Sequence, residues 1–359
     1  MAPVYCPSCH RNFHDEGHAF CPHDGTALVD APPTQRTGVR ATTQRGAIIG
    51  GRHVIEGFIG AGGMARVYLA TDSVTKQSVA IKILHREKAE DRGACERFLR
   101  EVEVAATIHH PNLIEVLDAG EVAGGVPYLV LELLVGESLG DLLRRVGAMP
   151  PKTALPLVRM AAAGLAAAHK AGVIHRDVKP DNLFLIGMPG SPTSLKVVDF
   201  GMAKLLERNV TAAGVALGTI EFMAPEQALA DTVDARADIY GLGVVLFRMI
   251  TGKLPFDTGD DALLVAQQIF QAPPRPSELR PGLDPQLEEV ILSMLRKHPD
   301  NRYASMAEVI ADIDRLLGDE PGQVRGAPLR RMPDAYEAVN PFGRTAARML
   351  KSKLSASGG

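Results

Sequence analysis

The spacing of apolar residues changes along the chain, from short runs near its start to a helical period further on. Two apolar runs, residues 54–59 and 67–70, flank a glycine-rich turn, and a third run covers residues 79–84. Short apolar runs bounded by turn residues predict strands. In residues 98–106 the apolar positions recur at helical spacing, so we expect a helix after the three strands.

The same pattern predicts the domains. Apolar periodicity is continuous over residues 51–317, which is long enough for one large domain that begins with strands and continues mainly with helices. Residues 29–50 are rich in Pro, Thr, Gln and Arg and lack this periodicity, which is typical of a linker. Residues 318–359 are rich in Gly, Pro and Arg, and we expect a flexible tail. The fold class that this order indicates is α+β.

Composition narrows the class of protein. Apolar residues make up 46% of the chain and charged residues 23%, which is an ordinary globular balance. The net charge of −3 argues against a general nucleic-acid or membrane-binding surface. No apolar run approaches the ~20 residues that cross a bilayer, and the N-terminus shows no secretory signal. We expect a cytoplasmic protein without a transmembrane segment or a nucleic-acid partner.

A glycine-rich loop and a lysine form the first candidate for chemistry. The loop reads Gly60-Ala61-Gly62-Gly63-Met64-Ala65-Arg66-Val67, and Lys82 lies on the strand that follows it. Glycines let backbone amides approach phosphate oxygens without interference from a Cβ atom. An ammonium group on the next strand can reach the same oxygens. A glycine-rich hairpin alone is equally compatible with a plain tight turn, so the loop needs support from other segments.

That support comes from the segment His175-Arg176-Asp177-Val178-Lys179-Pro180-Asp181-Asn182, followed by Asp199-Phe200-Gly201 and by Ala224-Pro225-Glu226. With these motifs the chain resembles the eukaryotic-like (Hanks-type) serine/threonine protein kinases over residues 52–317. The Gly-Gly-Met-Ala form of the loop is most similar to the bacterial branch, and Ala65 departs from the usual third glycine. The resemblance implies a small, mainly β N-lobe with one key helix over residues 51–134. It also implies a larger, mainly α C-lobe over residues 135–317.

The resemblance implies transfer of the γ-phosphoryl group of ATP to Ser or Thr hydroxyls of proteins, with Mg²⁺ or Mn²⁺. In this reading Asp177 accepts or orients the hydroxyl proton, and Asn182 and Asp199 ligate the metal through hard oxygen atoms. Glu101 is the expected partner of Lys82 because it precedes Pro111 by ten residues, the register of the family. Glu96 and Glu103 fall outside that register. The implied catalytic residues are Asp177, Lys179, Asn182, Lys82 and Glu101.

The resemblance also implies an ATP site between the lobes. Leu131 resembles the gatekeeper, and backbone groups of Glu132 to Leu134 are expected to bind the adenine under Ala80. The implied ATP contacts are Ile59, Gly60, Ala61, Gly62, Gly63, Met64, Ala65, Val67, Ala80, Lys82, Leu131, Glu132, Leu134, Asn182 and Asp199.

Substrate type and regulation follow from residues near the catalytic loop. Lys179 and Thr219 match the serine/threonine pattern of the family. Arg176 places a guanidinium beside Asp177, where an ordering anion is needed, and phosphate is the natural candidate. Thr211 is the one hydroxyl residue between Asp199 and Gly218. We therefore hypothesise activation by autophosphorylation of Thr211, with possible self-association; the alternative is an ordinary loop threonine.

Some conspicuous residues are expected to be structural. The resemblance implies that His175 braces the catalytic loop and that Asp238 anchors this loop through backbone hydrogen bonds. Glu226 and Arg302 are expected to form a buried ion pair. Cys95, on the predicted helix, is expected to be a packing residue.

Residues 1–28 form a Cys/His-rich unit that looks like a short zinc ribbon. Cys6, Cys9 and Cys21 provide thiolates at the spacing of two knuckles. Asp24 stands where a fourth Cys is expected, so a metal-free or degenerate knuckle is the alternative to a zinc site. Such a ribbon more often mediates protein contact than catalysis. The candidates for the fourth ligand are Asp24, His23, His10, His14 and His18.

Two other functions are compatible with parts of the sequence. A nucleotide-binding pseudokinase scaffold would signal through its N-terminal ribbon, but its mark would be loss of Lys82, Asp177, Asn182 or Asp199, and all four are present. A ribbon that binds nucleic acid would need phosphate contacts, and residues 1–28 hold only one Lys or Arg, namely Arg11. Residues 344–354 are basic and could contact anionic lipid or a partner, or be a solvated tail.

Overall fold

The structure is a computed structural model of the chain. It describes residues 44–63, 65–89, 102–188, 191–199 and 220–318, the single positions 95 and 99, and three two-residue strands near the N-terminus. The chain divides into two compact units, residues 1–47 and residues 48–359.

In the first unit the described residues form a small antiparallel sheet. β1 (Val4–Tyr5) pairs with β2 (Asn12–Phe13) on one side and with β3 (Val29–Asp30) on the other. The predicted zinc ligands, Cys6, Cys9, Cys21 and Asp24, lie outside the described residues. Zinc binding therefore stays a prediction.

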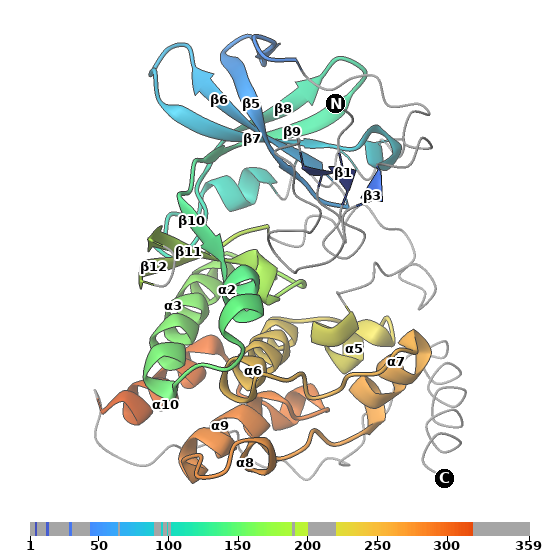
Figure 1. Ribbon diagram of the computed structural model, residues 1–359, viewed down its shortest axis with the longest axis vertical. Coiled ribbons are helices and arrows are strands. Elements are labelled where there is room, and N and C mark those ends of the chain that lie inside the picture. Colours follow the sequence, from blue (N-terminus) through green and yellow to red (C-terminus); the bar gives the residue numbers. More distant parts are fainter. Residues whose placement is uncertain are drawn as a thin grey trace. The chain divides into compact units, whose positions relative to one another are not determined.

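The second unit begins with a large antiparallel sheet (Figure 1). Its strand order is β4-β5-β6-β7-β9-β8. In β6 the alternate side chains Tyr68, Ala70 and Asp72 are buried, as expected for a strand with one face in a core. The three strands predicted from the apolar runs are confirmed as β5, β6 and β7. The bounds of the strands in this sheet are β4 (Ile48–Ile49), β5 (His53–Ala61), β6 (Ala65–Asp72), β7 (Ser78–Leu84), β8 (Val116–Val122) and β9 (Val126–Glu132).

A helix packs against this sheet after a 3₁₀ turn, η2 (Arg86–Ala89). Residues 102–106 are helical, as are positions 95 and 99, so the helix predicted over residues 98–106 is confirmed where it is described. Leu99, Val102 and Ala106 share a core with strand residues such as Leu129. Cys95 is buried, in agreement with its predicted packing role.

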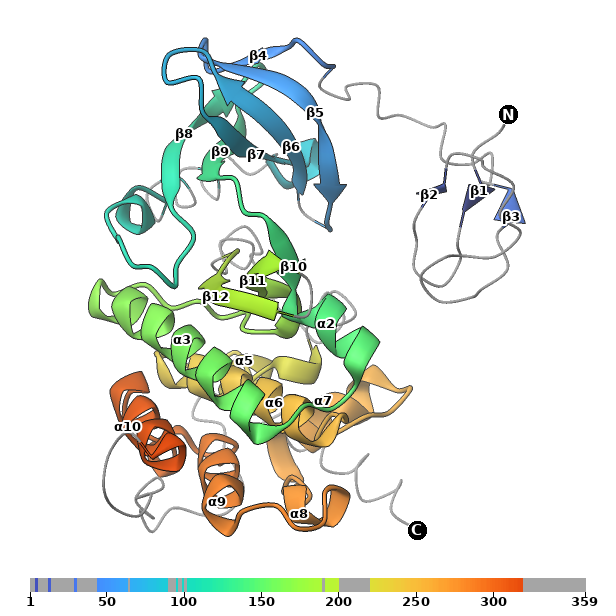
Figure 2. The same ribbon diagram turned by 60° about the vertical axis from the view of Figure 1, so that its left-hand side comes forward.

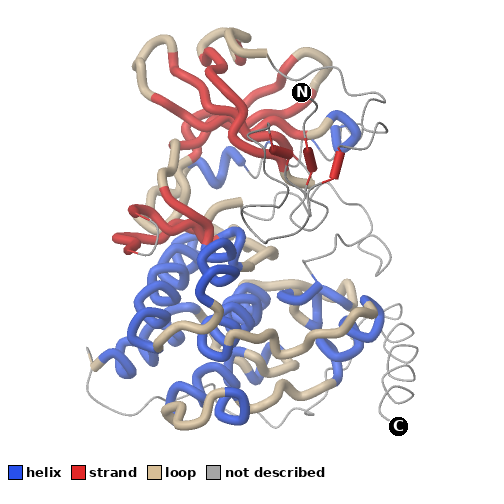
Figure 3. The backbone as a smooth tube through the Cα atoms, viewed as in Figure 1, coloured by secondary structure: helices blue, strands red, loops and turns tan. Residues whose placement is uncertain are grey.

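A second, smaller sheet follows the chain segment that leaves β9. β10 (Gly136–Ser138) pairs with β11 (Leu183–Met188), which pairs with β12 (Ser191–Val197). Only glycine fits at position 136, because a Cβ atom there would lie 1.8 Å from the carbonyl oxygen of Leu185. Figure 3 shows this sheet between the strand-rich part of the unit and its helices.

The rest of the second unit is helical (Figure 2). At its centre lies α6, whose residues are buried from Ala237 to Phe247. Ser138 caps α2 and Asp260 caps α7 by accepting backbone N–H groups of the first turn. Among the described residues, no helix is long and apolar enough to span a membrane. The helices and 3₁₀ turns are α2 (Leu139–Val146), α3 (Pro151–Lys170), η3 (Pro180–Asn182), η4 (Ile220–Phe222), α5 (Pro225–Ala228), α6 (Arg236–Thr251), α7 (Asp261–Phe270), α8 (Pro276–Leu279), α9 (Pro285–Met294), η5 (Pro299–Asn301) and α10 (Met306–Leu317).

Candidate active site

The loop between α3 and β11 brings three of the predicted catalytic side chains together. Asp177 Oδ2 accepts hydrogen bonds from Asn182 Nδ2 at 3.0 Å and from Lys179 Nζ at 2.9 Å. Asn182 Nδ2 also donates to the backbone oxygen of Asp177 at 2.8 Å. Both side-chain partners use Oδ2, so Oδ1 is the oxygen left to accept a further proton. In Asn182 the amide nitrogen makes these bonds, which leaves its amide oxygen for a metal ion.

Buried groups from the helical core hold the backbone of this loop. Asp238, at the start of α6, accepts the N–H of His175 through Oδ2 at 2.8 Å and the N–H of Arg176 through Oδ1 at 2.7 Å. His169 Nε2 lies 2.7 Å from Asp238 Oδ2. The predicted anchoring role of Asp238 is confirmed. Arg176 has a left-handed backbone, with φ 63°, a conformation that non-glycine residues keep only where the surroundings impose it.

Gln227 of α5 holds the backbone oxygen of Arg176, a role that the sequence did not predict. Its Nε2 donates to the backbone oxygen of Arg176 at 2.9 Å, and its Oε1 accepts the N–H of Ala224 at 3.2 Å. Both backbone groups of Arg176 are therefore fixed, one by Asp238 and one by Gln227. The only sequence signal was its place directly after Glu226.

His175 is a brace, as predicted. Its Nε2 bonds to the backbone oxygen of Val198 at 2.9 Å, and its Nδ1 accepts the N–H of Asp177 at 3.2 Å. Because Nδ1 acts as an acceptor here, the proton of a neutral ring lies on Nε2. The ring thus ties the catalytic loop to the segment that carries Asp199.

Lys82 of β7 reaches across to Asp199, which follows β12. Nζ of Lys82 lies 2.6 Å from Asp199 Oδ1, and Asp199 has φ 57°. Burial raises the pKa of the Asp199 carboxyl, but the charge and hydrogen bond of Lys82, with His175 and Lys179, outweigh burial and hold that pKa below its ordinary value. Asp199 is therefore an ionised oxygen donor at neutral pH, as a metal ligand must be. Glu101, the predicted partner of Lys82, lies outside the described residues.

The glycine-rich loop is the hairpin between β5 and β6. Added Cβ atoms at Gly60, Gly62 and Gly63 would meet nothing within 4 Å, so this hairpin is open on the side where a glycine lacks its side chain. The N–H of Gly62 bonds to the backbone oxygen of Ala65 at 2.9 Å and closes the turn. Ala65 is buried opposite Leu84 of β7. Of the other predicted loop contacts, Ile59, Ala61 and Val67 lie on β5 and β6, and Met64 lies outside the described residues.

The predicted adenine contacts lie where β7 and β9 pair. Ala80 is opposite Leu131, and both are buried. The carboxylate of Glu132, the next residue, has a structural job that the sequence analysis missed. Its Oε1 accepts the N–H of Glu115 at 2.8 Å and Lys196 Nζ at 2.6 Å, and Lys196 also donates to the backbone oxygen of Leu113 at 2.9 Å. Leu134 follows in the segment between the two sheets.

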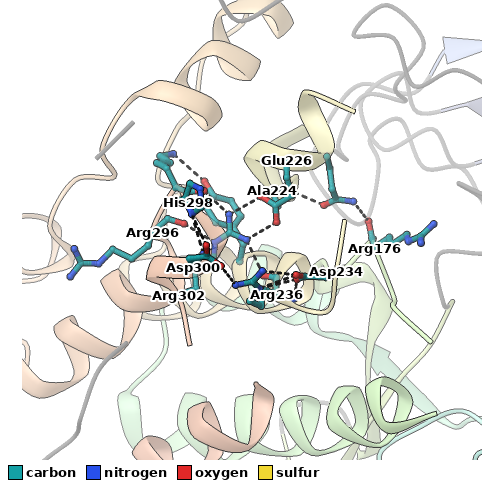
Figure 4. Close-up of polar contacts among 12 residues, drawn as sticks. Arg176, Ala224, Glu226, Asp234, Arg236, Arg296, His298, Asp300 and Arg302 are labelled. Carbon is teal, nitrogen blue, oxygen red and sulfur yellow. Dashed lines mark hydrogen bonds and ion pairs between the residues drawn. The ribbon is translucent and has the colours of Figure 1, made fainter. Parts of the chain in front are cut away.

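A buried ion pair lies behind the loop, in the region drawn in Figure 4. Arg302 donates to Glu226 through Nη1 at 2.6 Å and Nη2 at 2.8 Å, and the two side chains are 0% and 1% exposed. The predicted pair is confirmed. The other three N–H groups of Arg302 donate to backbone oxygens of Arg296, Arg236 and Lys297, so all five guanidinium donors have acceptors.

Comparison with known proteins decides the family. A family model described as the protein kinase domain matches residues 53–312. The chain belongs to this protein kinase family. Relatives of the kinase chain include serine/threonine-protein kinase PknB of Mycobacterium tuberculosis, which is 39% identical over 277 residues that make up 75% of this chain and 44% of PknB. PknB of Mycolicibacterium smegmatis is 38% identical over 284 residues, 77% of this chain and 44% of the relative.

A solved kinase structure gives the same result for the fold. The crystal structure of the Mycobacterium tuberculosis PknI kinase domain superposes with a TM-score of 0.62 at 27% identity, covering 77% of this chain and 99% of that chain. The predicted two-lobed fold and the resemblance to bacterial serine/threonine kinases are therefore confirmed. The kinase chain spans less than half the length of the PknB relatives.

Proposed function

We propose that this chain transfers the γ-phosphoryl group of ATP to serine or threonine hydroxyls of proteins, with Mg²⁺. The observation that carries the proposal is the convergence of three distant segments on one site. Lys82 from β7 of the large sheet binds Asp199 at 2.6 Å, and His175 links the Asp199 segment to Asp177. Phosphoryl transfer depends on positioned charges, and this arrangement positions cations and carboxylates together.

The residues present fit an ATP–Mg²⁺ complex. Mg²⁺ takes hard oxygen ligands, and the Asp199 carboxylate and the Asn182 amide oxygen are of that kind. The open glycines of the β5–β6 hairpin let phosphate oxygens approach backbone N–H groups. When bound, the complex supplies the phosphoryl group and the divalent charge that neutralises its oxygens.

The chain's own residues divide the remaining work. Asp177, with Oδ2 occupied by Asn182 and Lys179, orients the substrate hydroxyl and accepts its proton through Oδ1. The Lys179 ammonium, 2.9 Å from Asp177, adds positive charge where negative charge develops. Lys82 holds Asp199 in place and offers N–H groups to phosphate oxygens.

We propose the regulation and the location from the sequence. Thr211 and Thr219 lie outside the described residues, so activation by phosphorylation of Thr211 rests on the sequence alone, as do self-association, zinc in the N-terminal unit and a cytoplasmic location. The fixed backbone of Arg176 supports the activation idea, because it presents this arginine at a defined point beside Asp177. Full activity of Thr211→Ala toward an exogenous substrate would remove it.

The main test is incubation of the purified chain with labelled ATP, Mg²⁺ and a protein substrate. We expect label on serine or threonine, and a fall of at least about 10²-fold for Asp177→Asn, since the lost carboxylate acts at the reacting atoms. Asp284→Asn, the same change at an exposed helix cap that keeps its acceptor oxygen, is the matched control. Label that appears only in free nucleotide, or an Asp177→Asn variant as active as the control, would contradict the proposal.

A further inference from the structure

A buried chain of hydrogen bonds runs through the helical lobe from Lys297 to the turn η4. Lys297 Nζ donates to Tyr240 Oη at 3.2 Å, and Tyr240 Oη donates to Gln268 Oε1 at 2.5 Å. Gln268 Nε2 then donates to the backbone oxygens of Glu221 at 2.6 Å and Ile220 at 3.3 Å. Polar groups buried this deeply normally serve a defined partner, and the last partners in this chain are two backbone carbonyls of η4.

The orientation of the Gln268 amide follows from its partners. Carbonyl oxygens can only accept, so the two contacts to Ile220 and Glu221 require the NH₂ end, and the oxygen end must face Tyr240. Gln268 and Tyr240 are each 1% exposed, so water cannot replace either partner. Lys297 steadies the other end by donating to the backbone oxygens of Gln267 and Gln268 as well, at 3.2 and 2.7 Å. The chain therefore joins α6, α7 and the segment of Lys297 to η4.

The turn η4 lies beside the catalytic loop. A Cβ atom added at Gly241 of α6 would lie 3.0 Å from the backbone oxygen of Val178 and 3.5 Å from that of Phe222, so α6 packs closely against both the loop and the turn. The segment that follows η4 is tied to the same loop, because Gln227 accepts the N–H of Ala224 and donates to the backbone oxygen of Arg176.

We propose that Gln268 is a positioning residue for the protein substrate: held by Tyr240 and Lys297, it fixes the Ile220–Glu221 backbone next to the catalytic loop, where the substrate hydroxyl has to reach Asp177. The inference rests on the proposed kinase activity. It assigns Gln268 no contact with ATP, because its partners all lie in the helical lobe. A change at Gln268 should therefore separate the two substrates of the reaction.

The test compares Gln268→Glu with Tyr240→Phe. A glutamate keeps an acceptor for Tyr240 but loses the donor to the two carbonyls and repels them, whereas phenylalanine keeps the buried ring and removes one oxygen. We expect the KM for a peptide substrate to rise about tenfold in Gln268→Glu and about threefold in Tyr240→Phe, because each variant loses hydrogen bonds that hold the Ile220–Glu221 backbone. The KM for ATP should stay unchanged, because the partners of Gln268 lie in the helical lobe. Gln271→Glu, an exposed change at the end of the same helix, is the matched control.

A second readout does not depend on activity. The N–H of Met223 bonds to the backbone oxygen of Ile220 at 3.2 Å, so hydrogen exchange at residues 220–223 reports the order of the turn. We expect faster exchange there in both variants and unchanged exchange in the control. Peptide KM and exchange both at wild-type values would overturn the inference, as would equal losses for ATP and peptide. If Gln268→Glu does not fold, Tyr240→Phe decides the matter. A wild-type chain that phosphorylates nothing would refute the kinase activity, and exchange would still decide the role of Gln268.

Discussion

Two charged clusters of this kinase have similar distances and different surroundings. The pair Lys82–Asp199 in the candidate active site and the pair Arg302–Glu226 in the helical core both have a closest N···O distance of 2.6 Å. The side chains of the first pair are 20% and 45% exposed, and those of the second are 0% and 1% exposed. A short ion pair alone therefore does not reveal function. Exposure separates groups that can meet a substrate from groups that hold the fold.

The Arg302–Glu226 pair and the active-site residues differ in how many of their hydrogen-bonding atoms have partners. Every donor of Arg302 has an acceptor within the protein, so nothing is left for a ligand. In the candidate active site, the contacts among the described residues leave one side-chain oxygen of Asp177 and one of Asn182 unused. Predictions that remove one group at a time can show whether this contrast holds.

The largest effect on stability is expected from Arg302→Met. The change leaves the Glu226 carboxylate buried without its partner, which should cost about 3–5 kcal/mol of unfolding free energy. Denaturation with urea, followed by circular dichroism, measures this loss. Arg296→Met is the matched control, because that side chain is 31% exposed and its ion pair with Glu289 is long, at 3.6 Å. Such a contact is worth less than about 1 kcal/mol. Equal losses in the two variants would show that burial is not the deciding factor.

A pH dependence should come from Lys297. Burial lowers the pKa of this amine, and the nearby charge of Arg302 lowers it further. Between that lowered pKa and 10.5, the ordinary value, the unfolded chain binds the proton and the folded chain does not, so stability rises with pH by up to about 1.4 kcal/mol per unit.

Lys297→Met removes this titration. Unfolding measured at increasing pH, up to about pH 9.5, should show the wild type gaining on the variant once the folded chain releases this proton. Burial raises the pKa of Tyr240 and of Tyr303, so neither ionises in the folded protein in this range. Parallel curves for the two proteins would mean that Lys297 keeps its ordinary pKa.

The smallest effect is expected from Gln227→Glu. A glutamate still accepts the N–H of Ala224 but cannot donate to the backbone oxygen of Arg176. We expect kcat to fall about fivefold, in keeping with about 1 kcal/mol for one hydrogen bond, and little change in melting temperature. Gln286→Glu, on the exposed first turn of α9, adds the same charge away from the loop. If both variants keep wild-type kcat, Asp238 alone fixes Arg176.

Local patterns predicted much of this structure. The strands β5, β6 and β7 were visible because each has enough residues to show an apolar run. The catalytic loop was recognised through its resemblance to a family, which was possible because Asp177, Lys179 and Asn182 lie in one contiguous motif of the sequence. Two-residue strands such as β3 and β4, which lie within the segment predicted as a linker, are too short to show any period.

The roles of Gln227, Gln268 and Lys196 were not visible for a different reason. Each of them binds at least one partner that lies 28 to 83 residues away in sequence. A glutamine on a helix has no pattern that distinguishes a solvated amide from a buried one, because burial depends on which elements pack over it. Asp238 and Arg302 have similarly distant partners and were predicted only through resemblance to a family.

The bridge from Lys196 to Glu132 has a mechanical consequence. It fastens the last residue of β9 to β12, and Lys196 binds the Leu113 backbone as well. This ion pair therefore acts as a staple between the end of the large antiparallel sheet and β12. Any rocking of one lobe over the other must pivot on the three residues that follow the staple, Leu133 to Val135, or else break it. If the pivot lies earlier in the chain, the movement must separate Lys196 from Glu132.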